Sequence, residues 1–174
     1  GSGTIWLSET PVVPSKGWDA AFPRIATWAL LRDRGSGEML RIVNSHFDHV
    51  GVIARHQSAA LLLQWLSQGE WAGLPTVLMG DFNSPPEGSA YRLIAEDRAL
   101  GLRDARLASV TPAYGPAGTF NAFKIASNAP TPIDHIFVSG RFTVKSCSVV
   151  TQHWGGRLPS DHYPVVADLV LTKD

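Results

Sequence analysis

Short apolar runs separated by turn residues recur along the chain and predict a protein built largely from β-strands. Several runs are rich in valine, isoleucine and aromatic residues, which fit the pleated surface of a sheet. Glycine, proline, aspartate and asparagine stand between them, as is typical of turns. The pattern predicts strands at residues 4–6, 25–31, 39–47, 76–80, 119–123, 133–138, 142–151 and 164–171.

Two segments instead show apolar side chains at helical spacing. Residues 50–68 present one broad apolar face, and residues 89–97 repeat that pattern over a shorter length. The polar turn at 32–37 predicts a hairpin, whereas 9–23 and 106–118 carry prolines and glycines that predict irregular loops. Hairpins combined with two crossover helices indicate an α/β or α+β sheet protein.

Composition narrows the class of protein. The 174 residues suit one domain, and a hydrophobic share of 44% can supply a core. The sequence has no apolar run of about 18 residues, so no segment predicts a transmembrane helix. Fifteen basic residues balance 15 acidic ones, which removes a global positive field as an argument for nucleic-acid binding but leaves a local patch open. The single cysteine, Cys147, excludes an internal disulfide and a cysteine metal cluster.

Four polar motifs stand where predicted strands begin or end. NSHFDH (44–49) and GDFN (80–83) close two strands, whereas DH (134–135) and SDHYP (160–164) open two others. If these strand ends share one sheet edge, a single cleft collects three or four carboxylates, at least two histidines and two amides. Carboxylates hold hard divalent cations, and a histidine oriented by a carboxylate can stabilise or protonate a phosphoryl oxygen. The set therefore suits hydrolysis of an anionic ester.

The GDFN motif also predicts its own backbone. Gly80 would let substrate or a neighbouring chain come close. If the strand stays extended to Asn83, alternation places Asp81 and Asn83 on one side and turns Phe82 into the core. The following Pro85-Pro86 pair would direct the chain away and leave the site open.

Each motif also has an explanation that involves no chemistry. Asp81 and Asn83 could cap their own turn, as Asx residues do. His46 could be a hydrogen-bonded core histidine, Asp134 could belong to a surface pair, and Asp161 could belong to a loop turn. All four explanations would have to hold together for the catalytic hypothesis to fail, which makes them the less economical interpretation.

In this order the motifs resemble the endonuclease/exonuclease/phosphatase superfamily, the group of deoxyribonuclease I, exonuclease III and the sphingomyelinases. The stretches VNSHFDH, VLMGDFNSPP, PIDHIFVS and PSDHYPVVADL match successive signatures of that family between residues 43 and 169. The segment GWDAAFPRIATWALL further resembles a bacterial subgroup of metal-dependent hydrolases. The resemblance implies an α/β (α+β) fold that forms part of a four-layer α/β/β/α sandwich of the deoxyribonuclease I-like type.

Carried over position by position, the resemblance implies a division of roles. Asp81 would activate or orient the attacking water, and Asn83 would help to position the water and the phosphate. His162 would face the scissile phosphate with Asp134 orienting its ring. Asp161 would belong to the metal shell.

The resemblance also implies the remaining contacts and the reaction. His46 would donate to a phosphate oxygen, supported by Asn44. Water would attack phosphorus in line, with Mg²⁺ or Mn²⁺ neutralising the developing charge. Arg24 is a candidate phosphate contact because the planar guanidinium matches phosphate oxygens. Trp18 is a candidate for stacking a sugar or a base.

The sequence departs from the family pattern at its start. Two upstream family motifs have no counterpart here: an early strand that ends in asparagine, and a glutamine–glutamate pair whose glutamate is the principal metal ligand. Glu9 lies in a loop and Glu38 lies near a hairpin turn, so neither fits that ligand. We therefore expect residues 1–174 to form a single domain that is N-terminally incomplete. Such a domain would expose a sheet face through which it could self-associate.

The predicted substrate is a small or medium phosphate ester, such as a sugar phosphate, a nucleotide or a lipid head group. Nucleic acid is the less favoured class, because the charge is balanced and the sequence has no lysine and arginine cluster. The alternative hypothesis is a non-catalytic binding module on the same fold, which the absence of the family glutamate motivates.

Overall fold

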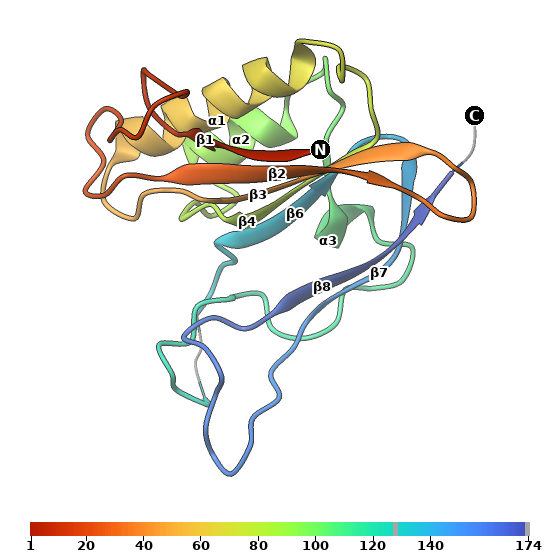
Figure 1. The fold of residues 1–174 in the computed structure, drawn as a ribbon. Coiled ribbons are helices and arrows are strands. Elements are labelled where there is room, and N and C mark those ends of the chain that lie inside the picture. Colours follow the sequence, from red (N-terminus) through yellow and green to blue (C-terminus); the bar gives the residue numbers. More distant parts are fainter. Residues whose placement is uncertain (127–128, 173–174) are drawn as a thin grey trace.

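A six-stranded sheet forms the centre of the molecule in the computed structural model, which describes residues 1–126 and 129–172 (Figure 1). Its strands follow the order β1-β2-β3-β4-β6-β5, and all neighbours are antiparallel except β3 and β4. The predicted hairpin of the second and third strands is confirmed. The strands are β1 Ser2–Trp6, β2 Ile25–Arg32, β3 Met39–His46, β4 Thr76–Asp81, β5 Arg103–Asp104 and β6 Asp134–Val138.

Two helices cover one face of this sheet. Helix α1 (Val52–Ser67) provides the crossover between parallel strands β3 and β4, and α2 (Ser89–Ala95) packs beside it (Figure 1). Both helices were predicted, and each is two or three residues shorter than expected. Their apolar sides and the adjacent sheet face form a buried cluster that includes Leu62, Leu66 and Phe137. None of the helices in the described part of the chain is long and apolar enough to cross a bilayer.

The other face of the six-stranded sheet packs against a second, two-stranded sheet. Strands β7 (Phe142–Val149) and β8 (Val165–Leu171) pair antiparallel, and a second buried cluster lies between the two sheets. The short helix α3 (Ala105–Ala108) lies against β6 and β7. This arrangement is the expected α/β fold with three of the four sandwich layers: helices, sheet and sheet. A second helical layer is not found among residues 1–126 and 129–172.

The segment around residues 103–123 differs from the prediction. Residues 119–123 do not form a strand, because Ala122 and Phe123 have positive φ angles of 52° and 60° that a strand cannot contain. The predicted loop at 106–118 overlaps α3, which begins after β5. Asp104 caps that helix by accepting a hydrogen bond from the Arg106 backbone N–H, a signal that was present in the sequence but spans very few residues.

The GDFN turn confirms one expectation about its backbone and contradicts another. Gly80 has a φ angle of 137°, and a Cβ atom there would lie 1.9 Å from the backbone oxygen of Ser45 on β3, so the close neighbour is a strand. Phe82 is buried against the core as predicted. The extended strand ends at Asp81, however, because Asn83 has a φ angle of 46°. Asparagine tolerates this left-handed conformation better than most residues.

Helix α1 begins at Val52 instead of residue 50, and its N-cap residue, Gly51, has no side chain to cap it. Its first free N–H groups are satisfied by Asp19, whose carboxylate accepts hydrogen bonds from Ile53 (3.2 Å) and Ala54 (2.6 Å). The loop that prolines marked as irregular is thus tied to the helix. A side chain at Gly51 would collide with this cap, since a Cβ atom would lie 2.6 Å from Asp19 Oδ1.

The fully buried carboxylate of Asp48 also connects this loop to the start of α1. Oδ1 accepts hydrogen bonds from the backbone of Val50 (2.9 Å) and Gly51 (2.7 Å), and Oδ2 accepts one from Phe22 (3.1 Å). Arg24 Nε lies 3.4 Å from Oδ2. Burial alone would raise the pKa of Asp48, but the backbone donors outweigh it and hold that pKa well below its ordinary range.

We predict that Asp48→Asn lowers the free energy of unfolding by about 2 kcal/mol at pH 7, because a charged acceptor of several buried N–H groups is lost. The folded-state pKa lies below the unfolded value of about 3.9, so this stability is present above that pH and is lost as the pH falls further. Urea unfolding at pH 7 and pH 3 measures both effects. Asp168→Asn, on the exposed face of β8, is the control with the same change in formal charge. A stability difference that is equal at both pH values contradicts the interpretation.

Candidate active site

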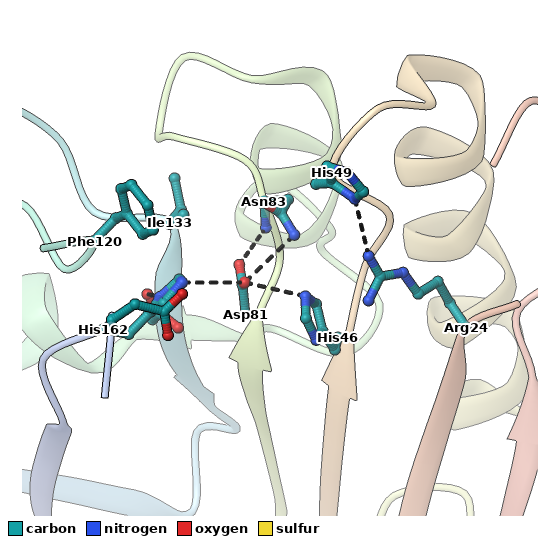
Figure 2. A pocket seen from close by; sticks show the side chains of 10 residues that line it. Arg24, His46, His49, Asp81, Asn83, Phe120, Ile133 and His162 are labelled. Carbon is teal, nitrogen blue, oxygen red and sulfur yellow. Dashed lines mark hydrogen bonds and ion pairs between the residues drawn. The ribbon is translucent and has the colours of Figure 1, made fainter. Parts of the chain in front are cut away.

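The four polar motifs meet at one edge of the central sheet. Strand pairing places His46, the last residue of β3, opposite Asp81, the last residue of β4, and Asp81 opposite Asp134, the first residue of β6. The loop before β8 adds His162 from the second sheet. These residues line a cleft of about 610 Å³ together with Arg24, His49, Asn83, Phe120, Ile133 and Asp161 (Figure 2).

Asp81 lies between two imidazole rings in this cleft (Figure 2). Its Oδ2 atom is 3.3 Å from His46 Nε2 and 3.9 Å from His162 Nε2. Burial raises the pKa of Asp81, and the negative charge of Asp134 adds to this effect against a backbone hydrogen bond from Asn83. A carboxylate with a raised pKa between two nitrogen bases can accept or share a proton.

Asn83 fits both interpretations that the sequence left open. Its backbone N–H donates to Asp81 Oδ1 at 2.8 Å, which is an Asx turn. Its side-chain amide donates to the backbone oxygen of Phe47 (2.9 Å) and to Asp81 Oδ2 (3.3 Å). The capping role and a position in the cleft are therefore compatible, since the same turn that satisfies the backbone holds the amide beside Asp81.

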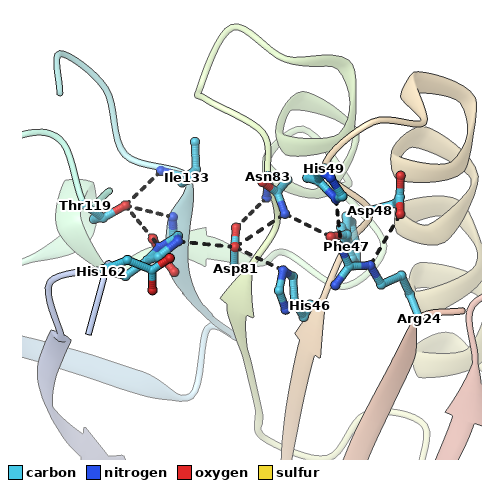
Figure 3. A network of polar contacts seen from close by, with 12 residues as sticks. Arg24, His46, Phe47, Asp48, His49, Asp81, Asn83, Thr119, Ile133 and His162 are labelled. Atoms are coloured by element: carbon cyan, nitrogen blue, oxygen red, sulfur yellow. Dashed lines mark hydrogen bonds and ion pairs between the residues drawn. The ribbon is translucent and has the colours of Figure 1, made fainter. Parts of the chain in front are cut away.

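A carboxylate orients the ring of His162 (Figure 3). Nδ1 of His162 donates to Asp134 Oδ2 at 2.8 Å, which leaves Nε2 facing the cleft. Thr119 also donates a hydrogen bond to the same carboxylate oxygen, and its hydroxyl accepts from the backbone of Ile133 (3.1 Å) and Asp134 (3.2 Å). This arrangement fixes both the tautomer and the plane of the imidazole.

The two histidines on either side of Asp81 have opposite pKa shifts. Burial disfavours charge on His162, but the hydrogen bond from its ring to Asp134 and the charges of Asp81 and Asp161 outweigh it, so the pKa of His162 is raised. For His46, burial is the largest effect and lowers the pKa, with a further contribution from Arg24 against the charge of Asp81. The cleft thus favours a cationic His162 beside a neutral His46.

The carboxylates also form a candidate metal site. One ligand atom each from Asp81, Asp134 and His162 lies within 4.8 Å of the others. Asp161 lines the same cleft. Divalent Mg²⁺ is commonly held by one or two carboxylates together with water and substrate oxygens, so the donor set fits a hard cation. Glu9 and Glu38 instead contact Trp18 and Arg141 and are not among the described residues that line the cleft.

One flank of the cleft is basic and aromatic. Arg24 extends its Nη2 to within 3.2 Å of His49 Nδ1 (Figure 3). The ring of His49 stacks on Phe22 at a centroid distance of 5.8 Å. Phe22 is 57% exposed and lies 6.0 Å from the Arg24 guanidinium carbon. The buried Asp48 holds Arg24 in place. This flank combines hydrogen-bond donors with a flat apolar surface.

Two predicted binding residues lie outside the main cleft. Asn44 lines an adjoining pocket of about 380 Å³, which shares Asp81, Asp134 and His162 with the cleft. Trp18 is not among the described residues that line either pocket, and its backbone N–H donates to the carboxylate of Glu9. Its left-handed backbone, with a φ angle of 44°, belongs to the loop that Asp19 and Asp48 hold in place.

Sequence reasoning missed three contributors. His49 received no role from the sequence, yet it lines the cleft beside Arg24. Thr119 lies in the segment that was predicted to be a strand, and only the folded chain places its hydroxyl on Asp134. Phe120 lines the cleft and has an edge-to-face contact with the His162 ring at 5.1 Å. The NSHFDH motif signalled His49, whereas nothing in the sequence marked the other two.

Two solved structures from Bacteroides thetaiotaomicron are similar to this chain over almost its whole length. An endonuclease/exonuclease/phosphatase family protein from Bacteroides thetaiotaomicron has a solved structure that is 38% identical, with a TM-score of 0.92 over 99% of this chain and 65% of that one. A mannosyl-6-phosphatase from Bacteroides thetaiotaomicron VPI-5482 is 39% identical, with a TM-score of 0.90 over 98% of this chain and 66% of that one. The chain thus spans about two thirds of the length of these structures.

A more distant relative matches part of the chain. An uncharacterised protein of Acanthamoeba polyphaga mimivirus is 34% identical over 82 residues, which cover 45% of this chain and 30% of that protein. The model of the Endonuclease/Exonuclease/phosphatase family matches residues 2–162, which is nearly the whole chain and includes Asp81, Asp134 and His162. The chain therefore belongs to the endonuclease/exonuclease/phosphatase family.

Proposed function

We propose that this chain carries the catalytic cleft of a divalent-metal-dependent phosphoesterase, which hydrolyses a phosphate ester by in-line attack of water. The observation that carries the proposal is Asp81 between His46 and the Asp134-bound His162, at one sheet edge. Membership in a family of hydrolases supports it, as does the similarity to a phosphatase at 39% identity. The activity and substrates of the whole protein belong to this proposal, since the chain spans 66% of that phosphatase.

The residues of the cleft divide the work of the proposed reaction. Asp81 orients the attacking water and accepts its proton. The amide of Asn83 positions the water and a phosphate oxygen. His162 presents Nε2 to the phosphoryl group as a cation, while Asp134 holds its ring. His46 donates to another phosphate oxygen, with Asn44 on the same face of β3.

Asp81 and Asp161 are the proposed holders of Mg²⁺ or Mn²⁺, with Asp134 close by. A bound divalent cation would supply charge neutralisation at the phosphoryl oxygens. The chain itself favours cation entry, because the carboxylates of Asp81, Asp134 and Asp161 gather at one end of the cleft. Proteins usually leave several positions of Mg²⁺ to water and substrate, which suits this small set of carboxylates.

The basic flank supports a small phosphate ester with a ring-shaped alcohol, such as a sugar phosphate. Asp48 offsets the charge of Arg24, so the flank provides hydrogen bonds and an aromatic face without a strong positive field. A sugar ring can stack on Phe22 while Arg24 binds a phosphate oxygen or hydroxyls. A nucleotide could use the same surface, and nucleic acid stays the less favoured class because the chain is neutral overall.

Two further hypotheses remain proposals of lower rank. A non-catalytic binding module would use the same cleft to hold a phosphorylated ligand. Self-association would cover exposed apolar side chains on the sheets, such as Ile25 and Leu31 of β2 and Val166 and Val170 of β8. The first hypothesis concerns the cleft, and the second concerns exposed side chains of β2 and β8.

Substitution of the central residues should abolish catalysis. We expect Asp81→Asn and His162→Ala each to lower kcat by about 100-fold or more, because each removes a group that exchanges or stabilises charge in the transition state. Hydrolysis of p-nitrophenyl phosphate and bis-p-nitrophenyl phosphate with Mg²⁺ or Mn²⁺ measures this. His153→Ala, an exposed histidine away from the cleft, should leave kcat unchanged. Equal rates for all four proteins would refute the assignment.

Metal binding separates the enzyme from the binding module. Calorimetric titration with Mn²⁺ should show one saturable site whose affinity falls about 10-fold or more in Asp81→Asn, since a ligand of the cleft is removed. A chelator should stop hydrolysis, and added Mg²⁺ or Mn²⁺ should restore it. Asp168→Asn serves as the charge-matched control. Weak, unsaturable binding that is identical in the three proteins would favour the non-catalytic module.

The proposed substrate class rests on the basic flank and can be tested there. Arg24→Ala should raise KM for mannose 6-phosphate and Ki for inorganic phosphate about 10-fold, because both lose a charged hydrogen bond. Phe22→Ala should raise that KM about threefold to 10-fold with an unchanged Ki, because only the ring loses its stacking surface. Equal effects of Phe22→Ala on both ligands would argue against a sugar-binding flank.

A further inference from the structure

A buried polar cluster lies behind the cleft, on the helix-covered face of the central sheet. It consists of Ser84 after β4, Tyr91 of α2, Asp104 of β5 and His135 of β6, which are 3%, 6%, 8% and 3% exposed. The proposed reaction uses none of these side chains. Buried polar groups cost stability unless they are hydrogen-bonded, so a cluster of this kind calls for a physical reason.

Two hydrogen bonds and one longer side-chain contact connect helix α2 to the turn that carries Asn83. Tyr91 Oη donates to Asp104 Oδ2 at 2.7 Å, and His135 Nδ1 lies 3.6 Å from the same oxygen. On its other side, His135 Nε2 donates to the backbone oxygen of Ser84 at 2.9 Å. The rings of Tyr91 and His135 are in contact at a centroid distance of 4.7 Å. His135 is therefore hydrogen-bonded through Nε2, approaches Asp104 through Nδ1 and contacts Tyr91 through one ring face.

Ser84 is fixed by its side chain as well as by its carbonyl group. Its hydroxyl oxygen accepts a hydrogen bond from the backbone N–H of Tyr91 at 3.3 Å. On the other side of Asn83, the ring of Phe82 is fully buried and packs edge-on against Phe47 and Phe137 at 4.9 and 5.6 Å. Asn83, whose backbone is left-handed, thus lies between two residues that are held in place. This limits the freedom of its side-chain amide to move away from Asp81.

The same histidine is adjacent to the other half of the cleft. His135 follows Asp134 on β6, and neighbouring residues of a strand point to opposite faces of the sheet. Asp134 binds His162 on the cleft face, while His135 binds Ser84 on the helix face. Because Asp134 pairs with Asp81, the contacts of Asp134 and His135 are both made where the ends of β4 and β6 meet.

We propose that Tyr91, Asp104 and His135 form a positioning network that holds the Asn83 turn in its catalytic geometry. His135 is the central positioning residue, because it alone contacts both Asp104 and the Ser84 carbonyl. The proposal rests on the phosphoesterase function for its kinetic consequence, but the placement of the turn does not depend on that function. An apolar residue would fill the same volume, whereas only a hydrogen-bond donor specifies the position of the Ser84 carbonyl.

The test compares His135→Leu with His135→Gln. Leucine removes the donor to Ser84, and glutamine keeps an amide N–H near the position of Nε2. We expect His135→Leu to lower kcat about 10-fold or more with a KM within about twofold of wild type, as for other residues that orient catalytic groups. His135→Gln should recover most of kcat. Tyr91→Phe, which leaves the Ser84 contact in place, should lower kcat less than His135→Leu.

An activity-independent measurement separates this proposal from the proposed function. Hydrogen exchange of the Asn83 amide, which donates to Asp81 Oδ1, should be faster in His135→Leu and close to wild type in His135→Gln. Leu66→Ala, at the far end of α1, is the control for a general loss of stability and should change neither kcat nor this exchange. Unchanged Asn83 exchange in His135→Leu would overturn the proposal, even in an active enzyme. A wild-type chain without hydrolysis would overturn the proposed function and leave the exchange result decisive for the network.

Discussion

The close approach of β4 to β3 at Gly80 is the constraint on which the cleft depends. A side chain at this position would collide with the Ser45 carbonyl at 1.9 Å, so only glycine allows the two strands to pair up to their ends. That pairing sets Ser45 opposite Gly80 and therefore His46 opposite Asp81. A shift of one residue would turn the functional side chains to the opposite face of the sheet. The pairing register of β3 and β4 therefore decides which side chains face the cleft.

Acidic and basic side chains lie at opposite ends of the cleft. Carboxylates gather where β4, β6 and the loop before β8 meet, and Arg24 with His49 lies toward β2 and helix α1 (Figure 2). Because buried Asp48 balances Arg24, the field is dominated by the acidic end. That end raises the pKa of His162, while burial and Arg24 lower the pKa of His46. Two identical side chains therefore differ in pKa because of their surroundings alone.

Strand-end motifs were sufficient to predict the centre of the site but not its supports. His46, Asp81, Asn83, Asp134, Asp161 and His162 all line one cleft, because apolar runs and turn residues are local signals that locate strand ends. Thr119, Phe120 and the network of Tyr91, Asp104 and His135 depend on contacts between distant segments, which no local pattern reports. The wrongly predicted strand at 119–123 has the same cause. Its backbone N–H groups at Asn121 and Ala122 donate to the Asp161 carbonyl instead of a neighbouring strand.

The distant cap of α1 has a consequence for how the protein reaches its fold. The helix has no capping side chain at its own start and relies on Asp19, which is 34 and 35 residues before Ile53 and Ala54. The first turn of the helix can be completed only after a long chain closure, which raises the contact order of this region and slows its assembly. The loop that carries Arg24 and Phe22 is part of the same closure. The basic flank of the cleft and the first turn of the crossover helix should therefore form in one late, cooperative step.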